Sequence, residues 1–195
     1  MNPLDKITGT IITGLVIAVV IAIGNSTASV NGIQSIVIWL HVSAGVAWIG
    51  LLYYFNFVQV PSIAEANADE GGPGPVAITK YVAPRALLWF RWAALATWLA
   101  GAALLGGNFS NAFLLQPGWE PIGIGSWLGT IMLFNVWGLI WPNQQKILGM
   151  KKATDEEKVK ARRVALLASR TNTLLSIPML LLMTNGLSHR ALLGL

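Results

Sequence analysis

Five long apolar segments are the feature that most limits how this chain of 195 residues can fold. Each is close to the roughly 20 residues that an α-helix needs to cross the hydrocarbon of a bilayer. The segments lie at about 8–24, 33–58, 84–106, 123–142 and 164–187. The sequence therefore predicts an all-α fold: a single transmembrane domain over residues 1–195, built as an integral membrane bundle of five helices.

The composition excludes the main alternatives. Hydrophobic residues make up 54% of the chain and charged residues only 11%, whereas soluble domains carry about 25% charge. A small soluble domain cannot enclose so much apolar surface, and a disordered chain would be far more polar. Cysteine is absent, which excludes disulfides, thiolate metal sites, cysteine nucleophiles and covalent c-type haem attachment.

The basic residues predict the orientation in the membrane. With a cytoplasmic N-terminus, the inner segments are 1–7, 59–83 and 143–163, and they hold or border most of the 13 Lys and Arg residues. The outer side has Arg190 alone. Because Lys and Arg accumulate on the cytoplasmic side, we expect a cytoplasmic N-terminus and a periplasmic C-terminus. Basic loops beside a membrane also account for the net charge of +5, so no nucleic-acid partner is expected.

Several local signals refine this arrangement. The first apolar segment is short, follows Lys6 and precedes a small-residue run at 26–29, which also resembles a signal peptide; we expect it to remain uncleaved and to span. Thr154 and Glu157 form a capping box that predicts a solvated helix leading into the fifth span. Pro142 is expected to stop or kink the fourth span.

A histidine in the second span is the first candidate for a site. His41, Gly45 and Trp48 follow the spacing i, i+4, i+7 and share one helix face. An imidazole can ligate haem iron, and a glycine beside it leaves room for a flat macrocycle. The alternative is a histidine that is hydrogen-bonded to a neighbouring helix, with glycine permitting close packing. A second axial ligand would have to be His189, whose alternative is a solvated side chain at the interface.

A second cluster is expected in the inner half of the bundle. Arg91 and Arg170 lie at similar depth, with Asn56, Asn135 and Asn172 in the neighbouring spans. Guanidinium groups bind carboxylates and similar planar acceptors well, so the cluster suits haem propionates, a quinone head group or a small anion. The alternative is that both arginines reach to the cytoplasmic interface.

The motifs in these spans resemble a known family. Trp39-Leu40-His41, Trp48-Ile49-Gly50 and Tyr53-Tyr54-Phe55-Asn56 are similar to the membrane domain at the N-terminus of the bacterial membrane-bound urate oxidase (urate hydroxylase) family. Further motifs that look like the same family are Pro84-Arg85, Trp89-Phe90-Arg91-Trp92, Asn135-Val136-Trp137, Trp141-Pro142-Asn143, Ser169-Arg170-Thr171-Asn172 and Ser188-His189. The resemblance covers most of 32–189 and implies a multi-pass protein of the bacterial inner membrane.

The resemblance also implies a site and a chemistry. Full-length members would oxidise urate in the membrane helices and pass electrons to a C-terminal cytochrome c domain. Here the chain stops at Leu195 without a Cys-x-x-Cys-His motif, so the electron acceptor would be a separate protein, for example a cytochrome c. By resemblance, His41 would be the haem or site histidine, with haem b as the expected cofactor. The pocket would be lined by Asn56, Arg91, Asn135, Asn143, Arg170 and Asn172.

Three functions therefore stay open at the level of the sequence. The first is a haem-linked redox subunit of the urate oxidase type, with a ligand at Arg91 and Arg170. The second is a non-catalytic accessory subunit, packed against other membrane proteins in a larger respiratory or oxidative complex. The third is a transporter or channel for a small anion. No catalytic residue is identified, and whether the chain is an enzyme is left open.

Overall fold

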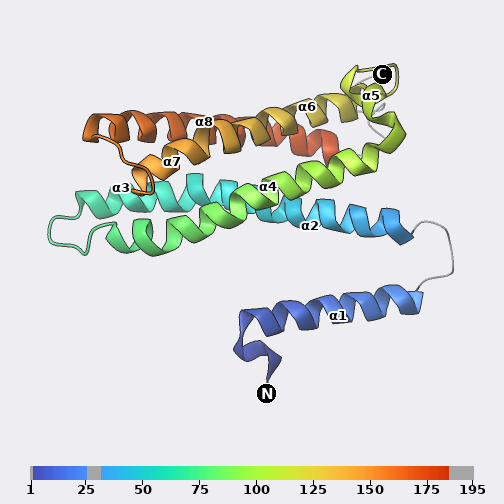
Figure 1. Cartoon of the computed structure of the whole chain (residues 1–195), viewed down its shortest axis with the longest axis horizontal. Helices are drawn as coiled ribbons and strands as arrows, with labels where there is room; N and C mark the ends of the chain where they lie inside the picture. Colours follow the sequence, from blue (N-terminus) through green and yellow to red (C-terminus); the bar gives the residue numbers. More distant parts are fainter. Residues whose placement is uncertain (1, 26–31, 185–195) are drawn as a thin grey trace. The chain divides into compact units, whose positions relative to one another are not determined.

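The structure is a computed structural model that describes residues 2–25 and 32–184 (Figure 1). Within these ranges the regular elements are all helical, which confirms the all-α prediction. The contacts divide the chain into two compact units, Met1–Ser35 and Ile36–Leu195. The single transmembrane domain stays a prediction.

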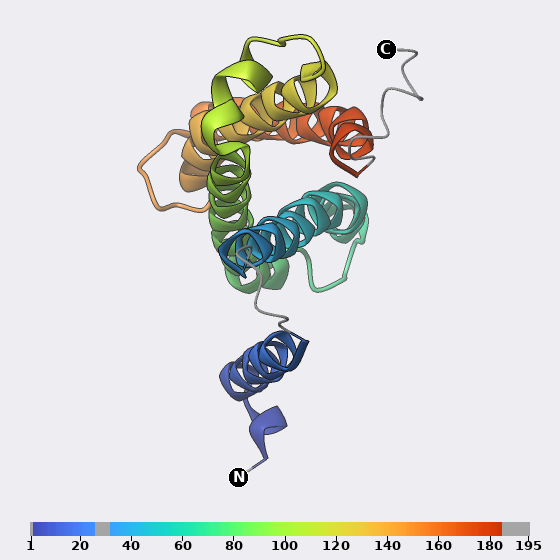
Figure 2. The ribbon, with the colours of Figure 1, turned by 90° about the vertical axis from the view of Figure 1, so that its right-hand side faces the viewer.

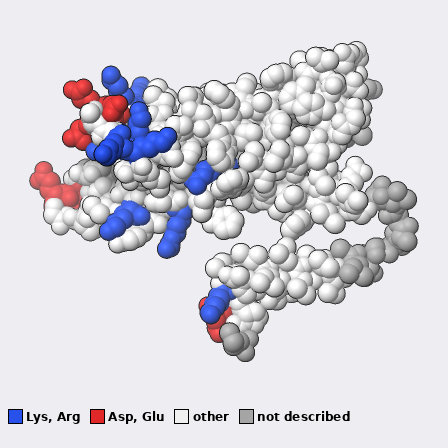
Figure 3. Space-filling view, viewed as in Figure 1, with Lys and Arg blue, Asp and Glu red and all other residues white. Residues whose placement is uncertain are grey.

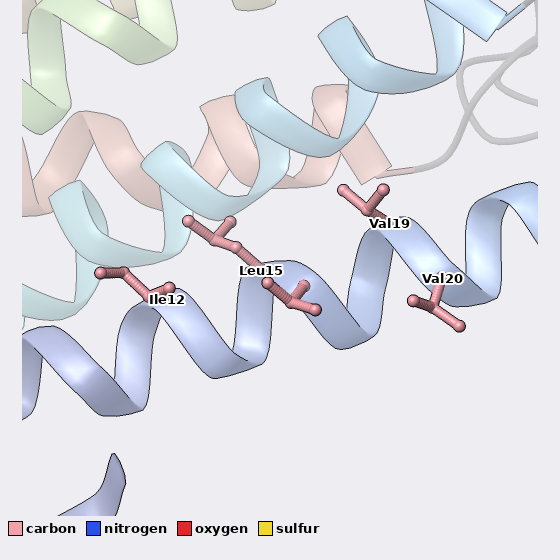
Figure 4. A pocket seen from close by; sticks show the side chains of 5 residues that line it. Ile12, Leu15, Val19 and Val20 are labelled. Atoms are coloured by element: carbon pink, nitrogen blue, oxygen red, sulfur yellow. The ribbon is translucent and has the colours of Figure 1, made fainter.

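The N-terminal unit contains one long helix. A short 3₁₀ turn, Pro3–Asp5, is capped by Asn2, whose side chain accepts the Leu4 N–H at 2.9 Å. Helix α1, Ile7–Asn25, covers the first predicted span, and its side chains up to Ile21 are largely exposed. Figure 4 shows the apolar surface lined by Ile12, Leu15, Val16, Val19 and Val20. The crossing of a membrane by α1 stays a prediction.

The main unit is built from four continuous helices, each assembled from several elements. The first joins α2 (Gly32–Tyr54), η2 (Phe55–Gln59) and α3 (Val60–Ala68). The second joins η3 (Ile78–Val82), α4 (Ala83–Leu105), η4 (Gly106–Asn108) and α5 (Phe109–Phe113). The third joins α6 (Glu120–Phe134), η5 (Asn135–Ile140) and α7 (Trp141–Ile147), and the fourth is α8 (Asp155–Thr184). All four are long and apolar enough to cross a membrane. They correspond to the second to fifth predicted spans.

These helices are longer than a bilayer requires. The first has 37 residues, which at 1.5 Å per residue is about 55 Å, against about 30 Å of hydrocarbon. The excess length carries charge. In Figure 3 the Lys, Arg, Asp and Glu side chains of the main unit gather mostly at the end formed by α3, α7 and the start of α8. The opposite end, near α5, shows none on this face.

Three prolines explain why the long helices are interrupted by π-helical turns. The π segments η2, η3 and η5 end at Gln59, Val82 and Ile140, each two residues before Pro61, Pro84 or Pro142. A proline cannot donate an N–H and its ring crowds the carbonyl four residues earlier. A widened turn relieves that crowding and keeps backbone bonds in place. The fourth span consequently continues through Pro142 to Ile147 instead of ending there.

The core lies where α2, α4, α6 and α8 meet. Figure 2 shows α4 between the α2–α3 helix and the α6–α8 pair. The Phe90 ring of α4 is 1% exposed and meets the Phe55 ring edge-on at 5.4 Å between centroids. Other side chains of the core are Leu52, Leu87, Met132, Val136 and Met179. Since α4 contacts the other helices from the middle, its small residues set how closely they approach.

The predicted capping box at the start of α8 is confirmed. The Glu157 carboxylate accepts the Thr154 N–H at 2.9 Å, and the Thr154 hydroxyl accepts the Glu157 N–H at 3.2 Å. Helix α8 then runs without interruption from Asp155 to Thr184, with Pro178 inside it. The solvated segment and the fifth predicted span are therefore one helix.

Two glycines of α6 provide a test of this packing. A Cβ at Gly123 would overlap the Ala112 carbonyl oxygen and lie 2.6 Å from Leu115 Cδ2, whereas a Cβ at Gly129 would meet nothing within 4 Å. Gly123→Ala should lower stability by about 1–3 kcal/mol through overpacking. Gly129→Ala should be neutral or stabilising, because alanine favours helix by up to about 1 kcal/mol. Thermal unfolding in detergent, followed by tryptophan fluorescence, measures both; equal midpoints would contradict the packing.

Candidate functional site

His41 is fixed by a bond to the neighbouring helix. Its Nδ1 lies 2.8 Å from the backbone oxygen of Thr97 in α4. A carbonyl oxygen only accepts hydrogen bonds, so Nδ1 must carry the proton and donate it. In the neutral ring, Nε2 then holds the lone pair. Nε2 forms no hydrogen bond with any of the described residues.

Small residues of α2 and α4 make this approach possible. A Cβ added at Gly101 would lie 2.9 Å from Cε1 and 3.1 Å from Nδ1 of His41, so the imidazole rests directly against that glycine. A Cβ at Gly45 would meet Thr97 Cγ2 at 3.6 Å, which is ordinary contact. Gly101 therefore makes room for the imidazole, and the role of Gly45 in making room for a macrocycle stays a prediction.

Trp48 lies two turns beyond His41 on the same face of α2 and is 2% exposed. Its indole Nε1 has no hydrogen-bond partner, and neither has the Oε1 atom of buried Gln59; no other buried side-chain polar atom of the described residues lacks one. A buried donor without an acceptor costs about 1–3 kcal/mol. An acceptor oxygen beside Trp48 would remove that cost.

Arg91 packs against the third helix of the main unit. Its guanidinium carbon lies 3.8 Å from the centre of the Trp141 ring of α7. The Trp137 indole donates to the Arg91 backbone oxygen at 3.2 Å, and the Trp92 and Trp137 rings meet edge-on. A guanidinium stacked by its face keeps its N–H donors available in the plane. The arginine is thus held by aromatic rings and remains able to bind an anion.

Arg170 lies on a different face of its helix from the buried residues. The stripe of α8 that faces the core contains Ala165, Ala168, Asn172 and Ser176, whereas Arg170 is exposed. The structure therefore does not bring Arg170 into the buried amide cluster. Its predicted role in ligand binding stays a prediction.

The amides of the predicted inner cluster bind one another and the backbone. The Asn135 side chain donates to Asn172 Oδ1 at 2.8 Å, and Asn172 donates to the Met132 carbonyl at 3.0 Å. Asn172 is fully buried and Asn135 is 8% exposed. Interhelical bonds of this kind hold membrane helices together. The pair therefore joins α8 to the third helix at the start of η5.

Asn56 and Tyr53 make the equivalent connection between the first helix and α8. Asn56 donates to the Leu52 carbonyl at 2.9 Å and to Ser169 Oγ at 2.8 Å. The Ser176 hydroxyl donates to the Thr173 carbonyl at 2.7 Å. The 2.9 Å contact between Tyr53 and Ser176 therefore uses the tyrosine proton. Both bonds run along one contact line between α8 and the α2–η2 helix.

The remaining predicted residues are placed as follows. Asn143 donates to its own helix, at the Leu139 carbonyl, 2.7 Å away. His189 lies outside the described residues. The described residues contain no group of three or more His, Asp or Glu side chains that could hold a metal ion. Haem iron needs only one or two axial ligands from the protein.

Several partners were not identified from the sequence. Thr97 and Gly101 contact His41, and Ser169 contacts Asn56, yet each is a small residue in an apolar span. A polar residue in a span is itself a signal, because it must find a partner. The sequence does not say which partner it finds, since that depends on the rotation of each helix.

Taken together, these features define a class of protein. Four apolar helices long enough to cross a membrane are joined by buried hydrogen bonds between polar side chains, and this is the organisation of a helical membrane protein. The family model described as "Urate oxidase N-terminal" matches residues 27–119 and 119–191. The chain belongs to the urate oxidase N-terminal family, as its motifs indicated. No curated protein and no solved structure matches the chain.

The buried amide pair gives a testable prediction. Asn172→Leu should lower stability by about 1–2 kcal/mol, because it removes two interhelical hydrogen bonds and leaves the Asn135 donor unpaired. The double variant Asn135→Leu/Asn172→Leu should lose less than the sum of the single variants. Thr171→Leu, at the exposed neighbouring position, is the control. Unfolding in detergent compares the unmodified chain with both single variants, the double variant and the control. Additive losses of stability in the double variant would show that the two amides do not interact.

Proposed function

We propose that this chain is a redox subunit of the bacterial cytoplasmic membrane that binds haem b through His41 Nε2. The observation that supports it is the bond from His41 Nδ1 to the Thr97 carbonyl. Metal-ligating histidines characteristically donate their other ring N–H to a carbonyl or carboxylate, which fixes the tautomer and ring orientation. A nitrogen without a partner in apolar surroundings is costly, and ligation of iron would compensate for it.

Within this proposal, the residues of the chain have distinct roles. Thr97 holds the Nδ1 proton, Gly101 admits the imidazole, and Trp48 offers an unused N–H on the same face. When bound, haem b supplies one-electron chemistry. His189 is the candidate for a second axial ligand. A cytochrome c is the proposed class of electron acceptor.

Arg91 is the proposed anchor for an anionic or quinone-like ligand, with urate as the nominal substrate. Urate is a planar monoanion, and the in-plane donors of a stacked guanidinium suit such a group. Arg91 lies six residues from Thr97 in α4, a rise of about 9 Å. Four amides of the predicted pocket form hydrogen bonds to protein groups: Asn56, Asn135, Asn143 and Asn172. They would therefore affect the ligand by holding the helices in position.

The histidine is tested by the visible spectrum of the purified chain. The unmodified protein should show a Soret band, and His41→Ala should abolish it. Gly101→Ala should shift or weaken the band, since its Cβ would lie 2.9 Å from the imidazole. Gly50→Ala is the matched control, because a Cβ there meets nothing within 4 Å. Absence of a Soret band in folded, haem-supplemented protein would leave the accessory-subunit function instead.

The arginine is tested by ligand binding. Arg91→Gln should weaken the binding of urate by about 10- to 100-fold, because hydrogen bonds to charged groups contribute about 1.5–3 kcal/mol. Lys151→Gln removes the same charge from an exposed loop position and should change nothing. Isothermal titration in detergent measures both. Unchanged urate affinity in Arg91→Gln would show that this arginine serves packing against Trp141 alone.

A further inference from the structure

An exposed stripe on the second helix of the main unit has no role in the proposed function. It contains four residues that follow one another at about one helical turn: Tyr81, Arg85, Trp89 and Trp92. The exposed fraction is 59% for Tyr81, 63% for Trp89 and 52% for Trp92. Arg85 is exposed as well. We call these four residues the α4 stripe. The opposite side of α4 packs into the core.

Two cations lie at the start of the α4 stripe, Arg85 within it and Lys80 beside Tyr81, and neither forms an ion pair with a described residue. Among the described residues, the one ion pair is Lys158–Asp155. Arg85 is therefore without a carboxylate, and Lys80 lies 5.3 Å from the centre of the Tyr81 ring. Both lie at the start of the second helix of the main unit, which Figure 1 shows at the same end as α3. Two cations without a carboxylate at ion-pair distance favour an anion.

The spacing along the stripe fits the layers of a bilayer. From Arg85 to Trp89 the helix rises about 6 Å, and the headgroup layer on each side of the hydrocarbon is about 5–7 Å thick. With Arg85 among the lipid phosphates, Trp89 lies at the edge of the hydrocarbon, where tryptophan is enriched. Trp92, three residues further, then contacts the acyl chains.

We propose that the α4 stripe binds one anionic phospholipid, with the phosphodiester at Arg85 and Lys80 and the glycerol region beside Trp89. A zwitterionic lipid also carries a phosphate, but its ammonium group is repelled by the same two cations. An anionic headgroup has no such penalty, and each basic residue near an anionic surface contributes about 1 kcal/mol. The site therefore selects for net lipid charge.

Native mass spectrometry of the full chain tests this site. Titrated with phosphatidylglycerol or with phosphatidylcholine of the same acyl chains, the protein should retain one phosphatidylglycerol about fivefold more strongly. Arg85→Gln should remove that preference, and Arg85→Lys should keep most of it. Lys151→Gln, which removes one charge from the exposed loop, should bind as the unmodified chain does. Inorganic phosphate should not displace the lipid, because it lacks the acyl chains.

Two results would overturn the proposal. One is equal retention of the two lipids by the unmodified chain, as expected if this face is reserved for a protein partner. The other is an unchanged preference in Arg85→Gln. Should that variant fail to give monodisperse protein, Trp89→Leu decides: it should weaken retention of phosphatidylglycerol, and unaltered retention would place the lipid elsewhere.

Discussion

The structure depends on a single constraint: a polar group inside apolar helices must find its partner within the protein. The bonds His41–Thr97, Asn135–Asn172 and Asn56–Ser169 each join two different helices. Apolar contacts between helices in lipid are weakly directional, because lipid tails are as apolar as leucine. These few bonds therefore fix the rotation and register of the helices, and with them the position of every candidate site residue.

The same constraint acts on the backbone at the prolines. Pro61, Pro84 and Pro142 would each leave a carbonyl crowded and unpaired in a regular α-helix. The π turns η2, η3 and η5 precede them, and the Val60, Ala83 and Trp141 N–H groups bond back five residues. Widened turns also rotate the following residues relative to the preceding ones. Asn56 and Asn135 lie inside such turns, which helps to explain why both meet α8.

Sequence reasoning located the parts of the structure that follow from local chemistry. Apolar length predicted the four long helices, and Thr154 with Glu157 predicted the start of α8. Of the two effects expected of Pro142, the stop was wrong, because the helix continues to Ile147; the widened turn before the proline was not foreseen. The partners of His41 and Asn172 could not be predicted either, because hydrogen bonding across helices depends on rotations that apolar periodicity defines poorly when helices are hydrophobic all round.

Once the internal bonds are accounted for, few polar groups remain for a ligand. The amides of Asn135 and Asn172 are bonded within the protein, so they act as structural connections between helices. Among the described residues, the polar groups left without a hydrogen bond include His41 Nε2, the in-plane donors of Arg91, the Trp48 N–H and Gln59 Oε1. Two of these groups are donors and two are acceptors. In the proposed function, His41 Nε2, Arg91 and the Trp48 N–H would meet one ligand that combines a metal with anionic or carbonyl oxygens.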